Sequence, residues 1–556
     1  AALGVAEDLP AGVMIAAAYR RWGMTCAARL EGDFAFALWD APRRRLLCAR
    51  DVAGVRPLCY RLERGTLAVA QHAAALAPPT GAVRDAAVAD FLYGRVLDAE
   101  RTWFPGVMRL AAGHTLVFEN GALALHRHVS LNPAPPPPAG EAPARLRTLL
   151  DEAIARRTAG ADERVGVLLS GGLDSSTIAC LLRDQRKAAG APPLPVFAMM
   201  FREPARSNER RHFDAVVATG GFAPTVLELD GYAPFADFET LLAATGGPTL
   251  SPNLACMRAV VAAAAERGVS VLLDGHGGDE VVGHGYGLLD ELAARGAWPA
   301  LWREARGAAD NYGRSRATLV RRVAARQRQR IDAKVIAHLL APFDREAAAG
   351  PDRPPTHLLS RAFLHASDLA ERLRGVARPE AAGSEQAQHR AVLADPLQPY
   401  AFEVHAAFYG SLGVTARYPF WDRQVAEFCC GLPASEKLAR GWSRLVLRRA
   451  MAGVVPDSVL ARRDKLDFTV HLARGLVRHH HERIMHLLAA PDTPLAPFLD
   501  REQACAIYAG IAADPDAASG RAVQMIWRAA ALGIWLETRR EAALRPPKPA
   551  VQEAAA

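Results

Sequence analysis

Residues 165–176 read Val-Gly-Val-Leu-Leu-Ser-Gly-Gly-Leu-Asp-Ser-Ser, and their types and spacing suit the binding of phosphate. The apolar run 165–169 predicts a buried strand, and a helical pattern begins at Leu173. A glycine-rich turn between a strand and a helix directs free backbone N–H groups and the positive end of the helix dipole at one point. Gly171 and Gly172 let an anion approach the backbone closely, and the serine hydroxyls add donors.

Asp174 extends this prediction to a cation, because a carboxylate beside phosphate is unfavourable unless a metal ion bridges the two. We therefore expect Mg²⁺ at this turn. The loop differs from the P-loop pattern, which requires a lysine after its last glycine. It has instead the Ser-Gly-Gly-x-Asp-Ser pattern of the pyrophosphatase loop. Enzymes that resemble it cleave ATP between the α- and β-phosphates and adenylate a substrate.

A second glycine-rich turn lies in residues 272–286, Leu-Leu-Asp-Gly-His-Gly-Gly-Asp-Glu-Val-Val-Gly-His-Gly-Tyr, and it also follows a predicted strand. Parallel strands end at the same edge of a sheet, so we expect Asp279 to lie near Asp174 and to share one Mg²⁺ with it. An acidic turn that caps a helix is the alternative. A third polar stretch holds Arg444 and Lys465, and taken alone these two residues are typical of ordinary surface charge.

The distribution of apolar runs predicts two regions of different architecture. Before residue 132, short alternating runs between polar turns predict a β-rich, mostly antiparallel module. Five prolines in residues 132–140 predict an extended linker. After the linker, short apolar strands alternate with helical stretches, which predicts a doubly wound parallel sheet. From about residue 285 onward the pattern is almost entirely helical.

Composition excludes several classes of protein. The chain has 556 residues, half of them hydrophobic, so it can form more than one packed domain. It has no signal peptide and no apolar run near the ~18 residues of a membrane span, so we expect no membrane association. The eight cysteines are scattered and read as reduced residues of a cytoplasmic protein. A net charge of +8 without a nucleic-acid motif predicts no nucleic-acid partner.

These stretches, in this order behind Glu31-Gly-Asp-Phe-Ala-Phe-Ala-Leu-Trp-Asp40 and Arg50-Asp-Val-Ala-Gly-Val-Arg-Pro-Leu58, resemble the asparagine synthetase family. The residues in these motifs are most similar to those of the lasso-peptide macrolactam cyclase branch of the family. The resemblance implies an α/β protein with two domains. A truncated, β-rich domain like the Ntn-type (class II) glutamine amidotransferases would occupy residues 1–131, followed by the proline-rich linker 132–142. An ATP-pyrophosphatase domain, like the adenine nucleotide alpha hydrolases, with a doubly wound parallel sheet and a helical C-terminal part, would occupy 143–545, and a disordered tail 546–556.

The resemblance also implies ATP and Mg²⁺ as cofactors and gives roles to individual residues. Lys465 matches the lysine that stabilises the negative charge developing as the acyl adenylate is attacked, and Arg444 matches a basic phosphate contact. Asp174 and Asp279 match the magnesium carboxylates. The residues matched to ATP binding are Leu169, Ser170, Gly171, Gly172, Asp174, Ser175, Ser176 and Gly275.

The activity implied is ATP-dependent amide formation through an acyl adenylate. The favoured acceptor is an amine of a precursor peptide, with a protease as a further partner. The first alternative is a glutamine-hydrolysing enzyme that makes asparagine from aspartate, and the second is a non-catalytic scaffold. Thr415 stands where family members have Glu, Gln71 and His72 stand where they have Ser-Glu, and Ala112 replaces a proline. These departures favour the peptide amine, which needs neither a glutaminase nor a strong base.

The beginning of the chain bears on the amidotransferase half. The sequence begins Ala-Ala-Leu, its first methionine is Met14, and residues 15–23 are similar to the middle helix of such a domain. We therefore expect the nucleophilic cysteine and the glutamine-binding residues to lie upstream of Ala1. The residues present would then not hydrolyse glutamine by themselves.

Overall fold

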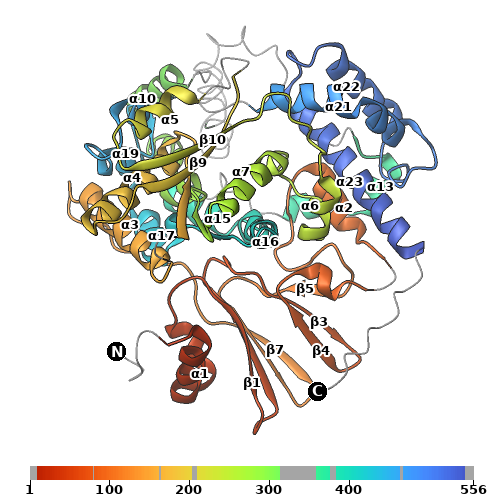
Figure 1. The fold of residues 1–556 in the computed structure, drawn as a ribbon, viewed down its shortest axis with the longest axis horizontal. Helices are drawn as coiled ribbons and strands as arrows, with labels where there is room; N and C mark the ends of the chain where they lie inside the picture. Colours follow the sequence, from red (N-terminus) through yellow and green to blue (C-terminus); the bar gives the residue numbers. More distant parts are fainter. Residues whose placement is uncertain are drawn as a thin grey trace.

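The computed structural model describes residues 9–78, 81–161, 164–202, 209–312, 323, 358–375, 383–463 and 468–544. Two antiparallel sheets built from the first 127 residues lie at one end of the molecule (Figure 1). A parallel sheet covered by helices forms the other end, so the α/β architecture expected from the sequence is confirmed. The segment expected to be a disordered tail, 546–556, lies outside the described residues.

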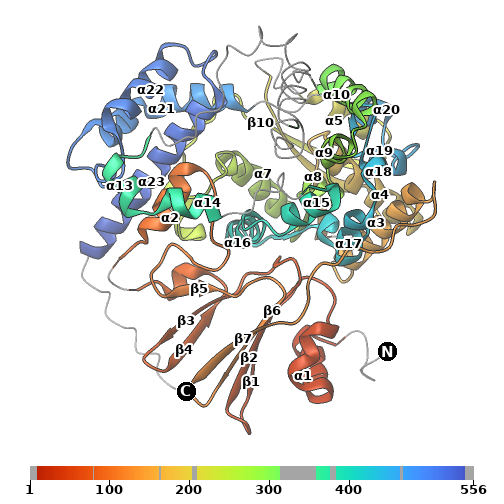
Figure 2. The ribbon, with the colours of Figure 1, turned by 180° about the vertical axis from the view of Figure 1, so that it is seen from behind.

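The N-terminal sheets pack against each other around a small apolar core that includes Cys48, Tyr60 and Leu116. The first sheet has the order β1-β2-β6-β7, with β1 (Ala35–Asp40), β2 (Arg45–Arg50), β6 (His114–Glu119) and β7 (Ala122–Arg127). The second has the order β4-β3-β5, with β3 (Cys59–Glu63), β4 (Thr66–Ala70) and β5 (Val107–Arg109). Helix α1 (Ala11–Trp22) lies beside the first sheet (Figure 2).

The proline-rich segment 132–140 forms neither helix nor strand, as expected from its composition. It is held against helix α17 (Arg423–Gly431) rather than standing free. The backbone N–H of Ala134 donates to the carbonyl of Glu427 at 2.9 Å, and a Cβ on Gly431 would overlap the carbonyl of Ala134. The linker therefore fixes the N-terminal sheets to the helical layer.

The parallel sheet has the order β10-β9-β8-β11-β12. Its strands are β8 (Val165–Leu168), β9 (Leu194–Met200), β10 (Phe222–Glu228), β11 (Val271–Leu273) and β12 (Thr415–Arg417). Helices in the connections include α4 (Leu173–Ala188), α5 (Arg210–Val217) and α7 (Leu254–Glu266). Because β8 pairs in parallel with β11, the turns that follow these two strands meet at one edge of the sheet.

The C-terminal part is mostly helical, as predicted, with one exception that matters for the site. Strand β12 enters the parallel sheet beside β11 although its sequence is too short to give a strand pattern. Helices α21 (Thr469–Ala489), α22 (Arg501–Ala513) and α23 (Gly520–Leu544) form a bundle, and α23 packs on α2 (Asp85–Tyr93) of the N-terminal part (Figures 1 and 2). None of the helices in the described ranges is long and apolar enough to cross a bilayer.

Candidate active site

The loop between β8 and α4 is closed by its own hydroxyl groups. The backbone N–H of Ser170 donates to Ser175 Oγ, and that of Gly172 donates to Ser170 Oγ, both at 3.2 Å. Gly171 has φ +77°, and a Cβ there would lie 2.6 Å from the backbone nitrogen of Phe213. The glycine is therefore required both by the turn and by the close approach of α5.

Two carboxylates from different strand ends converge beside this loop. Asp174, in the first turn of α4, and Asp279, in the short helix α8 (Gly278–Val282), both lie 2.7 Å from the same atom, Nη1 of Arg444. Gly278 allows the approach, because a Cβ there would lie 2.2 Å from Cγ of Asp174. The structure thus brings together three residues that the sequence analysis had selected from three separate stretches.

The carboxylate pair meets the first requirement of a magnesium site, because the two groups already converge on one cationic atom. Within the described ranges no cluster of three or more His, Cys, Asp or Glu side chains could hold a metal ion. Mg²⁺ in nucleotide sites is held by one or two carboxylates together with phosphate oxygens and waters. The pair therefore fits Mg²⁺ that arrives with a nucleotide, and does not fit a metal ion bound by the protein alone.

A cavity of about 340 Å³ opens over the loop. Its walls come from the β8–α4 turn, the β11–α8 turn, β9, α7 and α16 (Leu397–Gly410). Of the residues matched to ATP binding, six line it: Leu169, Ser170, Gly172, Asp174, Ser175 and Gly275. Gly171 and Ser176 do not, and the Ser176 hydroxyl is buried without a hydrogen-bond partner among the described residues.

A second cavity, of about 560 Å³, adjoins the first, and the two share Ser251, Asn253, His276 and His405. Its lining includes apolar, hydroxyl and amide side chains from α16, α21 and α23. Glu280 is the single Asp, Glu, Lys or Arg side chain among the described residues that line it. The second cavity is therefore larger than the first, adjoins it, and has little charge in its described lining.

An aromatic wall stands at the junction of the two cavities, and sequence reasoning missed most of it. The ring of His276 lies 5.5 Å from those of Phe402 and His405, and within 6.5 Å of those of Tyr418 and Trp421. Four of these five rings come from α16 and from the segment after β12, far along the chain from either glycine-rich turn. No local pattern marks them, because only the sheet order brings β12 beside β11.

The β11–α8 turn rests on a buried polar cluster. Lys437 has no exposed surface, and its Nζ lies 2.8 Å from Nδ1 of His389 and 3.4 Å from Glu385. Nε2 of His389 lies 2.8 Å from the carbonyl oxygen of Glu280. A carbonyl can only accept, so Nε2 carries the ring proton and Nδ1 accepts from the ammonium group. Burial lowers the pKa of His389 to about 3, which keeps the ring neutral.

Two further residues were singled out in the sequence, Lys465 and Thr415. Lys465 lies outside the described residues; nearby, Arg462 forms an ion pair of 2.5 Å with Glu209 and donates to the carbonyl of Gly171 at 3.3 Å. Thr415 pairs with Val271 at the start of β12, at the opposite end from the Asp274 turn. Thr415 lines neither cavity, so its side chain is not positioned as a base at their junction.

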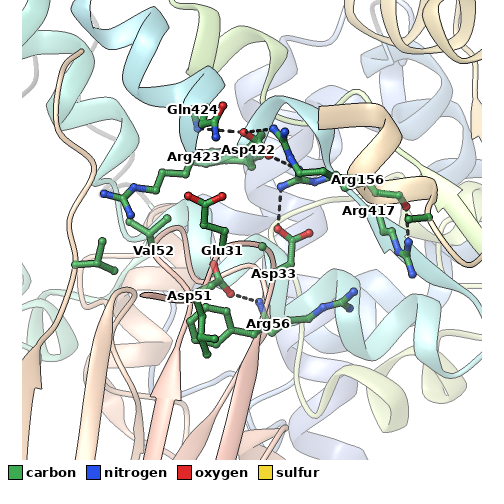
Figure 3. A pocket seen from close by; sticks show the side chains of 17 residues that line it. Glu31, Asp33, Asp51, Val52, Arg56, Arg156, Arg417, Asp422, Arg423 and Gln424 are labelled. Carbon is green, nitrogen blue, oxygen red and sulfur yellow. Dashed lines mark hydrogen bonds and ion pairs between the residues drawn. The ribbon is translucent and has the colours of Figure 1, made fainter. Parts of the chain in front are cut away.

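A third cavity, of about 380 Å³, lies between the N-terminal sheets and the helical layer (Figure 3). Buried Arg157 donates to Asp33 at 2.9 Å and to Asp422 at 2.8 Å, which links the two parts of the chain. Trp421 lines this cavity and also packs against His276, so its ring stands between the third cavity and the junction of the other two. The third cavity is lined by charged groups of both signs.

Comparison with known proteins places this geometry in a family. Residues 145–537 match the family described as asparagine synthase, and residues 11–129 match the glutamine amidotransferase domain. The chain belongs to the asparagine synthase family. Members of this family are ATP-dependent amidotransferases and ligases, so the protein is an enzyme that uses ATP.

The relatives span several described activities. The chain is 28% identical over 509 residues to a "putative asparagine synthetase (glutamine-hydrolyzing)" of Mycobacterium tuberculosis, covering 84% of this chain and 71% of the relative. It is 31% identical over 192 residues to asparagine synthetase (glutamine-hydrolyzing) 3 of Bacillus subtilis, covering 33% of this chain and 31% of the relative. It is also 27% identical over 309 residues to the amidase chyE of Penicillium rubens, covering 52% and 45%.

Proposed function

We propose that this asparagine synthase family enzyme adenylates a carboxylate with ATP and joins it to an amine of a peptide, as a macrolactam-forming cyclase does. The observation that carries the proposal is the second cavity, which adjoins the first at His276 and His405. Its size lies in the range that encloses a ligand larger than a free amino acid. Its described lining offers no Arg or Lys to bind the α-carboxylate of free aspartate.

The roles follow from the geometry and the family. The backbone of the β8–α4 loop and its serines would bind the ATP phosphates, and Asp174 and Asp279 would hold Mg²⁺ between them and the phosphates. Mg²⁺ would neutralise phosphate charge as pyrophosphate leaves. Arg444, whose guanidinium already lies at this point, would contact phosphate. Lys465 would stabilise the charge on the acyl adenylate under attack.

Asparagine formation is the second candidate, because two of the relatives above carry that name. It needs ammonia, from glutamine or from solution. The charged cavity between the two parts of the chain and the Trp421 ring beyond it favour an amine that enters through the second cavity instead.

We further propose that the division into an amidotransferase-like part, a linker and a synthetase part follows the boundaries 131, 142 and 545.

The test is a product assay on the full chain. With ATP and Mg²⁺, we expect AMP and pyrophosphate, not ADP, when a linear peptide with a free N-terminal amine and an aspartate side chain is supplied. Mass spectrometry should detect loss of one water from that peptide. Aspartate with ammonium or glutamine should give little asparagine. Asparagine formation at ordinary enzyme rates, on the order of 1–10 s⁻¹, would contradict the peptide proposal and support the alternative. ADP as the product would contradict adenylation.

A further inference from the structure

His405 occupies the point where the two cavities meet. It lies on α16 and lines both the cavity over the phosphate loop and the cavity proposed for the substrate. A group that passes directly from the second cavity to a carboxyl adenylated in the first crosses this junction. The titratable side chains that line both cavities, among the described residues, are His276 and His405.

The imidazole of His405 is held by one partner. Its Nδ1 lies 3.0 Å from the hydroxyl of Tyr418, the residue that follows β12. When Nδ1 donates its proton to the Tyr418 oxygen, Nε2 keeps its lone pair and can accept a proton. No described residue forms a hydrogen bond to Nε2. Burial lowers the pKa of His405 to about 4, so the ring is neutral throughout the neutral pH range.

We propose that His405 is the general base of the amide-forming step, with Tyr418 as the residue that positions it. The proposal rests on the adenylating function proposed above. The amine nitrogen attacks the acyl carbon and forms the C–N bond, and the acyl C–O bond to phosphate breaks as AMP leaves with its electron pair. The proton that the amine loses moves to Nε2 of His405 and then to solvent. The negative charge of the adenylate beside the ring favours its protonated form at that moment.

Other groups face His405 and must be weighed against it. Asp274 accepts from the buried hydroxyl of Tyr409 at 3.1 Å, and the backbone N–H of His276 donates to the same carboxylate, so Asp274 is already engaged. Nε2 of His276 is buried among aromatic rings and has no hydrogen-bond partner among the described residues. Glu280 lines the second cavity but not the first. His405 therefore combines an accessible position with a fixed orientation.

The experiment separates adenylation from amide formation in the full chain. Wild type and His405→Gln receive ATP, Mg²⁺ and a linear peptide with an N-terminal glycine and one internal aspartate. Pyrophosphate release with hydroxylamine as acceptor measures adenylation, and loss of water from the peptide measures amide formation. We expect H405Q to release pyrophosphate at the wild-type rate. We expect its rate of amide formation to fall by about 10²-fold or more, the usual scale of general-base catalysis. His479→Gln, on the exposed surface of α21, is the control and should change neither.

Tyr418→Phe provides an independent variant, because it removes one hydroxyl and keeps the ring. We expect unchanged pyrophosphate release, slower amide formation, and an acid limb of its pH profile that shifts relative to wild type. An H405Q enzyme that forms amide at the wild-type rate would overturn the proposal, as would equal loss of both steps. If amide formation were lost in Glu280→Gln or in His276→Asn but kept in His405→Gln, the base would be that other residue and the proposal would be overturned. A wild type that releases no pyrophosphate with the peptide or with aspartate would overturn the adenylating function and this inference with it.

Discussion

Asp174 and Asp279 show how little of this site is local to one stretch of sequence. Each follows a different strand, and each would be an ordinary acidic residue at a helix start if it stood alone. Together their carboxylates form one negatively charged site, because both contact Nη1 of Arg444 at 2.7 Å. A guanidinium at the point where two carboxylates converge marks the place where a cation is electrostatically favoured.

We therefore expect Asp174→Asn and Asp279→Asn each to abolish pyrophosphate release while the protein stays folded. An amide is a weaker ligand for Mg²⁺ than a carboxylate and does not neutralise its charge. Pyrophosphate release should be measured over a range of magnesium concentrations, with thermal unfolding as the check on folding. Asp184→Asn, on the exposed side of the same helix α4, is the matched control. Near-normal release by either folded site variant would contradict a shared magnesium role.

The sequence predicted the residues with a local signature and missed those without one. The strand, the two glycines and the helix start around Ser170 lie within one short stretch, so pattern and spacing predicted the loop. His405 and Tyr418 have no such signature, because an isolated histidine on a helix is most often a core residue. They reach the site only because β12 pairs with β11, and a three-residue strand has no periodicity to detect.

At the scale of elements, the short helix α8 depends for its stability on the buried polar side chains packed against it. Five residues cannot form a stable helix alone, so tertiary contacts must fix the turn that carries Asp279. The cluster of Lys437, His389 and Glu385 supplies these contacts, through the carbonyl of Glu280 and the backbone N–H of Gly287, which donates to Glu385 at 2.8 Å. A buried ammonium group is tolerable there because both neighbours accept from it.

Lys437→Met should be strongly destabilising, by ~3–5 kcal/mol, because it leaves the Glu385 carboxylate buried without its counter-charge. Burial already raises the pKa of Glu385, so the unpaired group would be driven further toward its neutral form. The double variant Lys437→Met/Glu385→Gln should recover part of the loss. Denaturant titration of the single and double variants measures this. A double variant no more stable than K437M would contradict a charge-pair origin.

His389 should make the protein sensitive to acid. Its pKa is about 3 in the folded chain against an ordinary 6.5, so the unfolded chain binds a proton there that the folded chain does not. Its contribution is fully present above about pH 6.5 and is lost as pH falls toward 3. His389→Gln should therefore flatten the fall in unfolding midpoint between about pH 4 and pH 7. His479→Gln, exposed on α21, should leave the slope unchanged, and an unchanged slope in H389Q would contradict the assignment.

At the scale of the whole molecule, ion pairs tie the N-terminal sheets to the synthetase part. Arg109 pairs with Glu403 of α16 at 2.5 Å, and Arg157 joins Asp33 to Asp422. The Asp422 carboxylate also caps helix α17 by accepting from the backbone N–H of Gln424 at 3.0 Å. Because α16 and the segment before α17 carry His405 and Trp421, the N-terminal sheets support one wall of the candidate active site. The N-terminal sheets can in this way contribute to activity through the shape of that wall.

Arg157→Met tests this coupling. Arg157 is buried, and its two carboxylate partners lie on opposite sides of the boundary, so removing its charge takes the counter-charge from Asp33 and leaves Asp422 paired with Arg156 alone. We expect a loss of ~3–5 kcal/mol and, in calorimetry, separation of one unfolding transition into two. Arg156→Met is the matched control: Arg156 precedes Arg157, its side chain is 40% exposed, and its ion pairs are with Asp422 and Glu152, both in the synthetase part. Arg156→Met should lower the free energy of unfolding by only ~0–1 kcal/mol, as is usual for surface ion pairs. Equal losses of stability in the two variants, or a single unfolding transition in both, would contradict this coupling. The two parts of the chain would then be held together by apolar packing, such as that of α23 on α2, rather than by the ion pairs of Arg157.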